Sequence, residues 1–318
     1  MDELKPDEER AAEIARKVLG ERPASVRRFP TGLEHYVYEV RTADGRSVVL
    51  RMGLPARRAA LRGGVYWSER LRPMGVPLPK LMAFDLEGKV SLFPFMLMER
   101  LAGTDLGEVY PQLSRMQKAE IAACVAGVQA VVGRLPQGKG YGYVANPELP
   151  FPHASWEAVI RASLARSRAD SGRAGLSDHG AVDRVERQVP RFAEYFARVA
   201  PRAFLDDTTT KNVIIDAGRL SGIVDVDSVC YGDPLITPAL TRMSLLNKGY
   251  DTDYVEAWCA LTAVSNEQRA VLQFYTAMFC VNFMGELGWA FNREAAPASA
   301  GQAERLEGLL EGLLKGME

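Results

Sequence analysis

The stretch FLDDTTTKNVIIDAGRLSGIVDVD, residues 204–227, places five aspartates around two apolar runs. Residues 213–215 are predicted to form a strand, residues 216–219 a tight turn and residues 220–224 the returning strand, because two apolar runs separated by a short turn segment are typical of a β-hairpin. The acidic residues lie at the ends of these runs and not within them. Several polar side chains are therefore expected to come together at the open end of the hairpin.

Asn212 and Asp225 are the residues that this hairpin is predicted to bring together, opposite each other and about 5 Å apart between Cα atoms. An amide oxygen and a carboxylate suit Mg²⁺, which takes few protein ligands and completes its coordination with water and substrate phosphates. Asp207 follows the apolar residue Leu205 and is expected in a loop at the same end. A carboxylate there can accept a proton from an attacking hydroxyl group. The stretch therefore predicts phosphoryl transfer.

The composition of the whole chain is that of an ordinary globular protein, since its 318 residues are 47% apolar and 25% charged. Lys and Arg number 39, Asp and Glu number 40, and the net charge is -1, so no overall field favours nucleic acid or an anionic membrane. The acidic N-terminus lacks an apolar signal core, and no apolar run approaches the length of a membrane span. We expect a cytoplasmic protein, a monomer or a homodimer, with neither nucleic acid nor membrane as a partner.

The pattern of apolar residues changes along the chain. Residues 36–52 alternate as in a hairpin, residues 57–72 have a helical period, and two apolar runs that follow are typical of strands. We therefore predict an α+β fold, with a small antiparallel sheet in an N-terminal lobe, residues 1–101, and a mostly helical C-terminal lobe, residues 102–318. The helical periods outside the first lobe's main helix cover residues 6–19, 114–134, 155–169, 181–199, 234–247, 252–264, 266–291 and 302–316.

The motif LDDTTTKN, followed by IVDVD, resembles the catalytic loop and metal-binding aspartate of the aminoglycoside and macrolide phosphotransferases, relatives of the protein kinases. Family members usually carry His-Gly-Asp, four residues and then Asn. In this chain Leu205 and Asp206 replace the His-Gly pair, whereas Asp207 and Asn212 keep the spacing. The resemblance implies a two-lobed, protein-kinase-like fold, with Asp207 as the catalytic residue and with Asn212 and Asp225 as the metal ligands.

Three segments of the first hundred residues are also similar to this family. TGLEHYVY, residues 31–38, resembles the turn that covers the nucleotide phosphates, although His35 replaces the usual asparagine. Arg51 lies where kinases place the strand lysine that contacts the phosphates, and arginine binds phosphate oxygens too. Residues 98–101 resemble the hinge whose backbone groups pair with adenine. The nucleotide-binding residues implied are Gly32, His35, Arg51, Met98, Glu99 and Arg100.

One departure from the kinase pattern concerns the helix glutamate that normally pairs with the strand lysine. Counting back from residues 75–79, this position falls on Gly64, so the expected ion pair cannot form there. Glu69 lies about a turn and a half further along the helix and points elsewhere. Arg51 is therefore expected to hold phosphate alone or with a group that the sequence does not reveal.

The resemblance implies an ATP-dependent O-phosphotransferase that uses Mg²⁺ and transfers the γ-phosphate to a hydroxyl group of a small molecule. GTP also fits as the donor, because a hinge recognises the base through backbone groups. The candidate substrate contacts are Asp206, Asp227, Glu286 and Trp289.

The acceptor is predicted only as a class. Because aminoglycoside kinases use acidic pockets for polycations and this chain is near neutral, the sequence favours a less cationic acceptor. The candidates are an antibiotic, namely a macrolide, a nucleoside antibiotic of the capuramycin type or an aminoglycoside, and a metabolic sugar or amino alcohol.

Three other interpretations stay open from the sequence. Asp225-Val226-Asp227 after an apolar strand resembles the nucleophile motif of haloacid-dehalogenase-type phosphatases, in which Asp225 would attack phosphate. A module that binds nucleotide without catalysis would account for the missing helix glutamate. Finally, Asp207, Asn212 and Asp225 are residue types that favour turns and caps for local hydrogen bonding alone.

Overall fold

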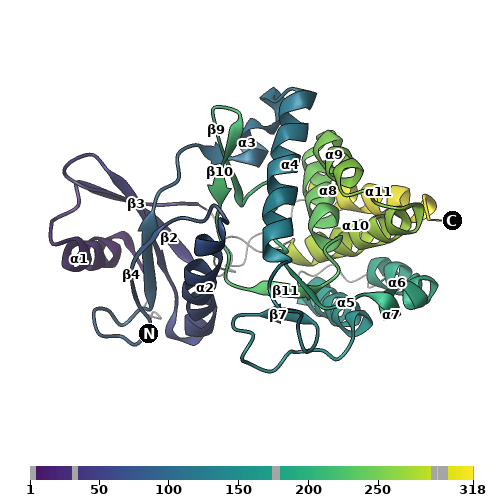
Figure 1. Ribbon diagram of the computed structural model, residues 1–318, viewed down its shortest axis with the longest axis horizontal. Helices are drawn as coiled ribbons and strands as arrows, with labels where there is room; N and C mark the ends of the chain where they lie inside the picture. The colour runs from purple at the N-terminus through teal and green to yellow at the C-terminus, as the bar shows by residue number, and fades with distance from the viewer. Residues whose placement is uncertain (1–4, 31–34, 174–179, 288–291, 293–299, 318) are drawn as a thin grey trace.

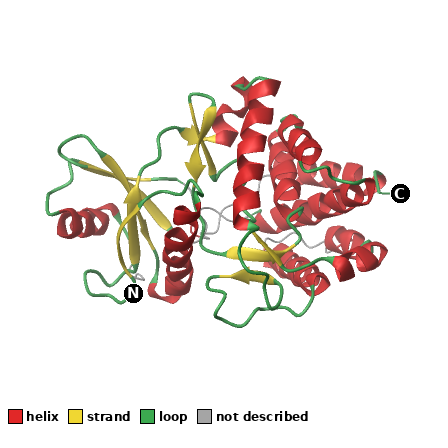
Figure 2. Cartoon of the chain, viewed as in Figure 1, coloured by secondary structure: helices red, strands yellow, loops and turns green. Residues whose placement is uncertain are grey.

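The computed structural model describes residues 5–30, 35–173, 180–287, 292 and 300–317. They form two lobes, a small one built around a sheet and a larger one built mostly from helices (Figure 1). Figure 2 shows the helices filling the far end of the large lobe, with short strands near the junction of the lobes. The predicted α+β, two-lobed organisation is confirmed, and the exact division at residues 101 and 102 remains a prediction.

The small lobe is a five-stranded antiparallel sheet with one helix on each face. The strands, in spatial order, and the helices are β1 (Ser25–Arg28), β2 (Tyr36–Arg41), β3 (Ser47–Met52), β5 (Phe95–Glu99) and β4 (Leu81–Asp85), with α1 (Glu8–Leu19) and α2 (Arg58–Leu71). Successive strand residues point to opposite faces. Leu50 and Leu97 therefore pack on the α1 side, whereas Met96 and Met98 pack with Leu61 of α2.

The large lobe contains the remaining helices and two small sheets. The two sheets have the strand orders β10-β9-β6 and β7-β11-β8. The elements in chain order are β6 (Thr104–Asp105), α3 (Leu106–Val109), α4 (Arg115–Val132), β7 (Gly142–Val144), α5 (Trp156–Arg173), α6 (Gly180–Glu186), α7 (Ala193–Arg198), β8 (Arg202–Phe204), β9 (Val213–Asp216), β10 (Arg219–Ile223), β11 (Val229–Gly232), α8 (Ile236–Lys248), α9 (Asp253–Leu261), α10 (Asn266–Glu286) and α11 (Ala300–Lys315).

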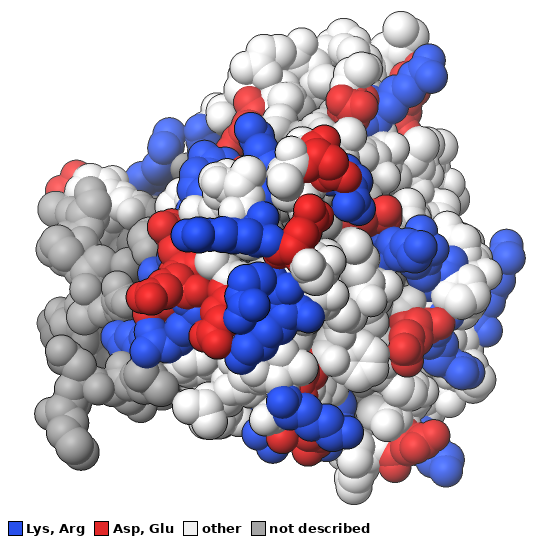
Figure 3. Space-filling model, turned by 90° about the vertical axis from the view of Figure 1, so that its left-hand side faces the viewer, with Lys and Arg blue, Asp and Glu red and all other residues white. Residues whose placement is uncertain are grey.

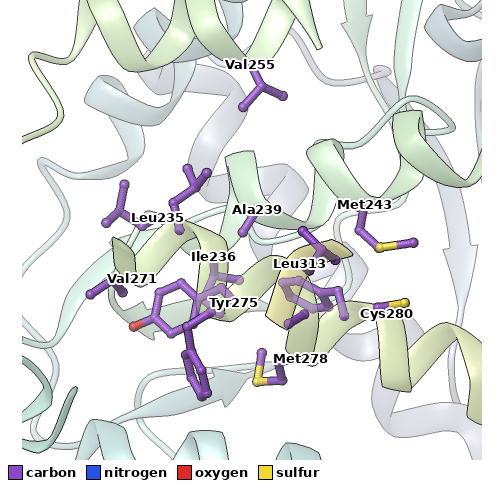
Figure 4. Close-up of a cluster of buried hydrophobic side chains, with 14 of the residues drawn as sticks. Leu235, Ile236, Ala239, Met243, Val255, Val271, Tyr275, Met278, Cys280 and Leu313 are labelled. Atoms are coloured by element: carbon purple, nitrogen blue, oxygen red, sulfur yellow. The ribbon is translucent and has the colours of Figure 1, made fainter. Parts of the chain in front are cut away.

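The core of the large lobe is centred on α10. Tyr275 and Met278 of α10 pack with Ile236 and Ala239 of α8 and with Leu313 of α11 (Figure 4). A helix that is apolar on several sides lies inside a protein rather than on its surface. Burial of each large apolar side chain contributes roughly 1.5–3 kcal/mol. This core supplies the rigid base from which the loops at the lobe junction extend.

The β9–β10 hairpin follows the sequence prediction closely. Its two turn residues, Ala217 and Gly218, have φ values of 46° and 78°, as a two-residue turn of type I′ requires. A bulge interrupts the pairing just before Gly222. A Cβ atom on Gly222 would lie 2.4 Å from the carbonyl oxygen of Pro77, and the Ile223 amide donates to that oxygen at 2.9 Å. The bulge glycine therefore lets the hairpin attach to the small lobe.

The structure corrects the sequence prediction in two respects. The predicted helix at residues 181–199 is divided into α6 and α7, with a 3₁₀ turn around Pro190, because proline removes a backbone donor and clashes with the preceding turn. The short strands β1, β6, β7, β8 and β11 were not predicted. These strands have two to four residues, which is too short for a clear alternation, and unlike the equally short β9 they do not border a recognisable hairpin turn.

No helix within the described ranges is long and apolar enough to cross a membrane. On the face presented in Figure 3, Lys and Arg side chains alternate with Asp and Glu side chains. This mixture agrees with the net charge of -1.

A buried hydrogen-bond network behind β11 is expected to contribute measurably to stability. The Tyr275 hydroxyl donates to Asp233 Oδ2 at 2.9 Å and accepts from Trp156 Nε1 at 2.6 Å. Tyr275→Phe leaves the indole donor without a partner and should lower the free energy of unfolding by about 1–3 kcal/mol. Urea unfolding measures this change, with the exposed-site variant Leu261→Ala as a control. Equal unfolding midpoints for wild type and Tyr275→Phe would contradict this role of the network.

Candidate active site

A cavity of about 530 Å³ lies where the two lobes meet. Its lining comes from β2, β3 and the connection at residues 98–101 on one side, and from residues 205–208 and 224–228 on the other. This volume is in the range of small-molecule and cofactor sites. Every described residue that the sequence assigns to nucleotide or metal binding contributes to this lining.

Asp207 lies in the loop between β8 and β9, and hydrogen bonds fix this loop at both ends. Thr209 Oγ1 donates to Asp207 Oδ1 at 2.7 Å, and Asn212 Nδ2 donates to the Asp207 carbonyl oxygen at 2.9 Å. Gln129 of α4 donates to the Leu205 carbonyl oxygen at 2.6 Å and accepts from its amide at 2.9 Å. These hydrogen bonds restrain the loop and so fix the position of the Asp207 carboxylate in the cavity lining.

Asn212 and Asp225 both line the cavity, but they are not directly opposite each other as predicted. The Val224 amide donates to the Asn212 carbonyl oxygen at 2.9 Å, so Val224 lies opposite Asn212. The two-residue turn alone would pair Asn212 with Ile223, and the bulge at Ser221 moves the partner on by one residue, still one short of Asp225. Asp225 comes one position later and has φ 65°, in the left-handed region that residues other than glycine seldom adopt. Such backbone conformations are concentrated at functional sites. The turn at Asp225 brings its carboxylate back to the cavity.

These two side chains fit a Mg²⁺ site. The Asn212 amide nitrogen is engaged with the Asp207 carbonyl oxygen, so the amide oxygen is the group left for a cation. No cluster of three or more His, Cys, Asp or Glu side chains suited to a metal occurs among the described residues. Two protein oxygen ligands are nevertheless sufficient for Mg²⁺, which takes its remaining ligands from water and substrate phosphates.

Arg51 of β3 is buried, with its side chain 8% exposed, and contacts two carboxylates. Its Nη1 donates to Asp227 Oδ1 at 2.9 Å, and its Nη2 donates to Asp227 Oδ2 at 3.0 Å and to Asp225 Oδ1 at 2.5 Å. Burial lowers the pKa of Arg51, but the two carboxylates outweigh this effect and the net shift of the pKa is upward. Arg51 therefore carries a permanent positive charge in the cavity.

The contacts of Arg51 answer the question raised by the missing helix glutamate. Asp227 supplies the carboxylate that pairs with Arg51, and two glycines of α2 leave room for it. A Cβ atom on Gly64 would lie 2.8 Å from Asp227 Oδ1, and one on Gly63 would lie 2.1 Å from the Asp227 carbonyl oxygen. Asp227 is thus the partner of Arg51 that the sequence did not reveal, and a substrate contact of Asp227, which also lines the cavity, stays a prediction.

The comparison with family models is consistent with this geometry. A model described as the phosphotransferase enzyme family, APH, matches residues 25–273. This chain belongs to that family. It is a phosphotransferase with an alcohol group as acceptor. A search of curated proteins gives no match.

Solved structures similar to this phosphotransferase share its fold at low sequence identity. An apo thermostable mutant of aminoglycoside phosphotransferase APH(4)-Ia has a TM-score of 0.67 and 15% identity, covering 96% of this chain and 98% of that chain. The streptomycin-ATP ternary complex of APH(2")-IIa gives 0.62 and 13%, covering 98% and 97%. A candidate fructosamine-3-kinase from Thermobifida fusca YX-ER1 gives 0.60 and 17%, covering 96% and 97%. These likenesses confirm the predicted kinase-like fold.

The predicted hinge of this phosphotransferase, residues 98–101, lines the cavity. The Glu99 amide donates to the Lys80 carbonyl oxygen at 3.0 Å, and its carboxylate accepts from the Lys80 amide at 2.7 Å. Arg100 Nε lies 2.9 Å from Glu39 Oε1. The side chains of Glu99 and Arg100 are therefore used within the small lobe, and nucleotide contacts at Met98, Glu99 and Arg100 remain predictions for the backbone.

The other predicted site residues have different positions. His35 lines the cavity, is buried, and has Nε2 at 2.7 Å from Asp227 Oδ2. Asp206 also lines the cavity. Glu286 is the last residue of α10 and is not among the described residues that line the cavity. Gly32 and Trp289 lie outside the described residues.

Two charged residues in the cavity wall, Asp105 and Lys211, were not predicted from the sequence. Asp105 directly precedes the short helix α3, a position typical of a helix cap, yet its side chain makes no capping hydrogen bond. Burial and the nearby Glu108 raise the pKa of Asp105 to about 6. Lys211 is adjacent to Asn212, and its charge opposes part of the upward shift in the pKa of Asp207. Only the positions of these residues, after the hinge and beside Asn212, could have indicated them.

Asp206 and Asp207 form an adjacent pair of enclosed carboxylates. Burial and then the Asp207 charge raise the pKa of Asp206 to about 7. Burial also raises the pKa of Asp207, although the hydrogen bond from Thr209 opposes this shift. Both residues line the cavity, with Asp206 partly exposed and Asp207 exposed, so they remain accessible to a substrate.

The raised pKa of Asp206 predicts a pH-dependent stability. The folded protein holds this proton more tightly than the unfolded chain, in which an aspartate titrates near pH 4, so the free energy of unfolding should fall as pH rises from about 4 to about 7. In Asp206→Asn the free energy of unfolding should fall less over this pH range, and above pH 7 the variant should be more stable than wild type. Unfolding in Mg²⁺-free buffer across this range measures it, with Asp216→Asn, at the exposed end of β9, as a control. Parallel curves for wild type and Asp206→Asn would refute the assignment.

Proposed function

We propose that this protein is an ATP-dependent O-phosphotransferase that uses Mg²⁺ and transfers the γ-phosphate to a hydroxyl group of a small molecule. The main support is that Asp207, Asn212 and Asp225 line one cavity, with the hinge residues at another part of the same wall. Three residues that served only as caps and turn formers would not need to share a cavity with a buried arginine.

The roles of the residues follow from their positions. Asp207 accepts the proton of the acceptor hydroxyl group and orients its oxygen toward the γ-phosphate. Arg51 offsets the negative charge of the phosphates from the small-lobe side. Asn212 and Asp225 would hold Mg²⁺, which supplies charge neutralisation at the phosphate oxygens when bound. Enclosure of the cavity by both lobes limits access of water to the phosphoryl group.

The acceptor that we propose is an antibiotic, with a macrolide, a nucleoside antibiotic of the capuramycin type and an aminoglycoside as candidates. Similar structures support the aminoglycoside among these candidates, since one aminoglycoside phosphotransferase was solved with AMP-PNP and hygromycin B and another with streptomycin and ATP. The second candidate is a metabolic sugar or amino alcohol, and the fold similarity to a candidate fructosamine-3-kinase favours it. The kinase-like fold and the family match weigh against a phosphatase that uses Asp225 as a nucleophile.

Asp207→Ala tests the proposed transfer step. Loss of the proton acceptor should lower kcat by roughly 10³-fold, as for other general bases, while binding of ATP changes little. Turnover assays and calorimetric titration with ATP measure the two effects separately, and Asp216→Ala serves as a matched control on the same hairpin. Wild-type turnover in Asp207→Ala would refute the assignment of the base.

A nucleotide-consumption screen tests the acceptor class. We expect consumption of ATP or GTP only in the presence of one class among macrolides, capuramycin-type nucleosides, aminoglycosides, sugars and amino alcohols, together with a product heavier by one phosphoryl group in mass spectrometry. Phosphate release from phosphate esters without any nucleotide would instead favour the phosphatase alternative.

A further inference from the structure

Three side chains from distant parts of the sequence meet on the small-lobe side of the cavity. His35 directly precedes β2, Arg51 belongs to β3, and Asp227 follows β10. Asp227 accepts two roughly parallel hydrogen bonds from Arg51 and lies within hydrogen-bonding distance of His35. A two-bond contact of this kind fixes the orientation of a guanidinium group as well as its distance.

Arg51 is shared between Asp227 and Asp225, which is a proposed metal ligand. The same nitrogen, Nη2, donates to Asp227 Oδ2 and to Asp225 Oδ1. The two carboxylates differ in exposure, since the Asp227 side chain is 21% exposed and the Asp225 side chain 47% exposed. A buried guanidinium needs a carboxylate partner, because an unpaired buried charge is strongly destabilising. If Asp227 were removed, Asp225 would be the carboxylate left beside Arg51.

We propose that Asp227 is a positioning residue that holds Arg51 at the phosphate side of the cavity and thereby leaves Asp225 for the metal ion. This inference rests on the proposed function. In the intact protein Arg51 can exchange its bond to Asp225 for a phosphate oxygen and keep both bonds to Asp227. Without Asp227, Arg51 competes with Mg²⁺ for Asp225.

The glycine pair of α2 explains why the carboxylate comes from the segment after β10 and not from the helix. Because Gly63 and Gly64 lack side chains, the backbone of α2 can approach Asp227 closely, and any Cβ atom at Gly63 would collide with the Asp227 carbonyl oxygen. Met96 of β5 closes the other side of the space beside Gly64. The helix therefore forms the wall of a pocket that the Asp227 side chain fills.

The distinguishing measurement is the Mg²⁺ dependence of nucleotide binding. Asp227→Asn keeps the shape of the side chain and removes its charge, so Arg51 should turn to Asp225. The Mg²⁺ concentration needed for half-maximal binding of a non-hydrolysable ATP analogue should rise by about 10–100-fold, as for other residues that support a metal ligand from outside its coordination shell. Calorimetry measures this rise, with Asp216→Asn as the control. An unchanged Mg²⁺ requirement in folded Asp227→Asn would overturn the proposal.

A double-mutant cycle separates this role from general stabilisation. If Asp227 acts through Arg51, adding Asp227→Asn to Arg51→Met should leave the Mg²⁺ requirement of the single Arg51→Met variant unchanged. A further rise in the double variant would contradict the proposal, because Asp227 would then act without Arg51. If the ion pair between Arg51 and Asp227 were purely structural, Asp227→Asn would change the unfolding midpoint and leave the Mg²⁺ requirement unchanged.

Returning the carboxylate to the helix gives a second, independent test. The distance from a Cβ atom at Gly64 to Asp227 Oδ1, 2.8 Å, is close to the reach of an aspartate side chain. The variant Gly64→Asp with Asp227→Ala should therefore restore the charge beside Arg51 and a Mg²⁺ requirement close to that of wild type. A folded relocated variant that still needs about tenfold more Mg²⁺ would count against the proposal. Failure of wild type itself to bind the Mg²⁺-nucleotide would instead refute the proposed function.

Discussion

The attachment of the β9–β10 hairpin to both lobes is the constraint on which the site depends. Its turn, with two residues at positive φ, fixes the strand pairing. Gly222, next to the bulge, has no side chain at the point where the Pro77 carbonyl oxygen approaches. The hydrogen bonds from Ile223 to Pro77 and from Val224 to Asn212 then place the chain just before Asp225. Because these bonds are made by the backbone, strand geometry determines where the chain places Asn212 and Asp225, the proposed metal ligands.

The buried charge of Arg51 shows how one electrostatic requirement can be met from different parts of a fold. The guanidinium group of Arg51, on a side chain that is 8% exposed, needs a carboxylate beside it. Any segment of the chain that reaches this place can supply that carboxylate. In this phosphotransferase the segment after β10 supplies it, and two glycines on α2 leave the necessary room. Because the carboxylate comes from this segment, Arg51 is connected directly to the part of the chain that follows β10 and carries Asp225, a proposed metal ligand.

Local patterns in the sequence predicted the hairpin, most helices and the loop that carries Asp207, because each depends on neighbouring residues. They misplaced the partner of Asn212 by one residue, because the two-residue turn and the bulge together decide the pairing and only Gly222, a glycine inside the predicted strand, indicated a bulge. The partners of Arg51 were also beyond reach, because Asp227 is 176 residues away and only the folded chain brings the two together. Asp105 could not be singled out from the sequence either, because only the folded chain shows that its side chain makes no capping hydrogen bond and lines the cavity.

The most direct test of the central claim is a crystal structure of the protein with Mg²⁺ and a non-hydrolysable ATP analogue. We expect the Asn212 amide oxygen and an Asp225 carboxylate oxygen at about 2.0–2.1 Å from Mg²⁺, with phosphate oxygens completing the coordination. The Asp207 carboxylate should face the terminal phosphate across the space for the acceptor. A metal-nucleotide bound elsewhere, with Asn212 and Asp225 contacting only protein, would contradict the account.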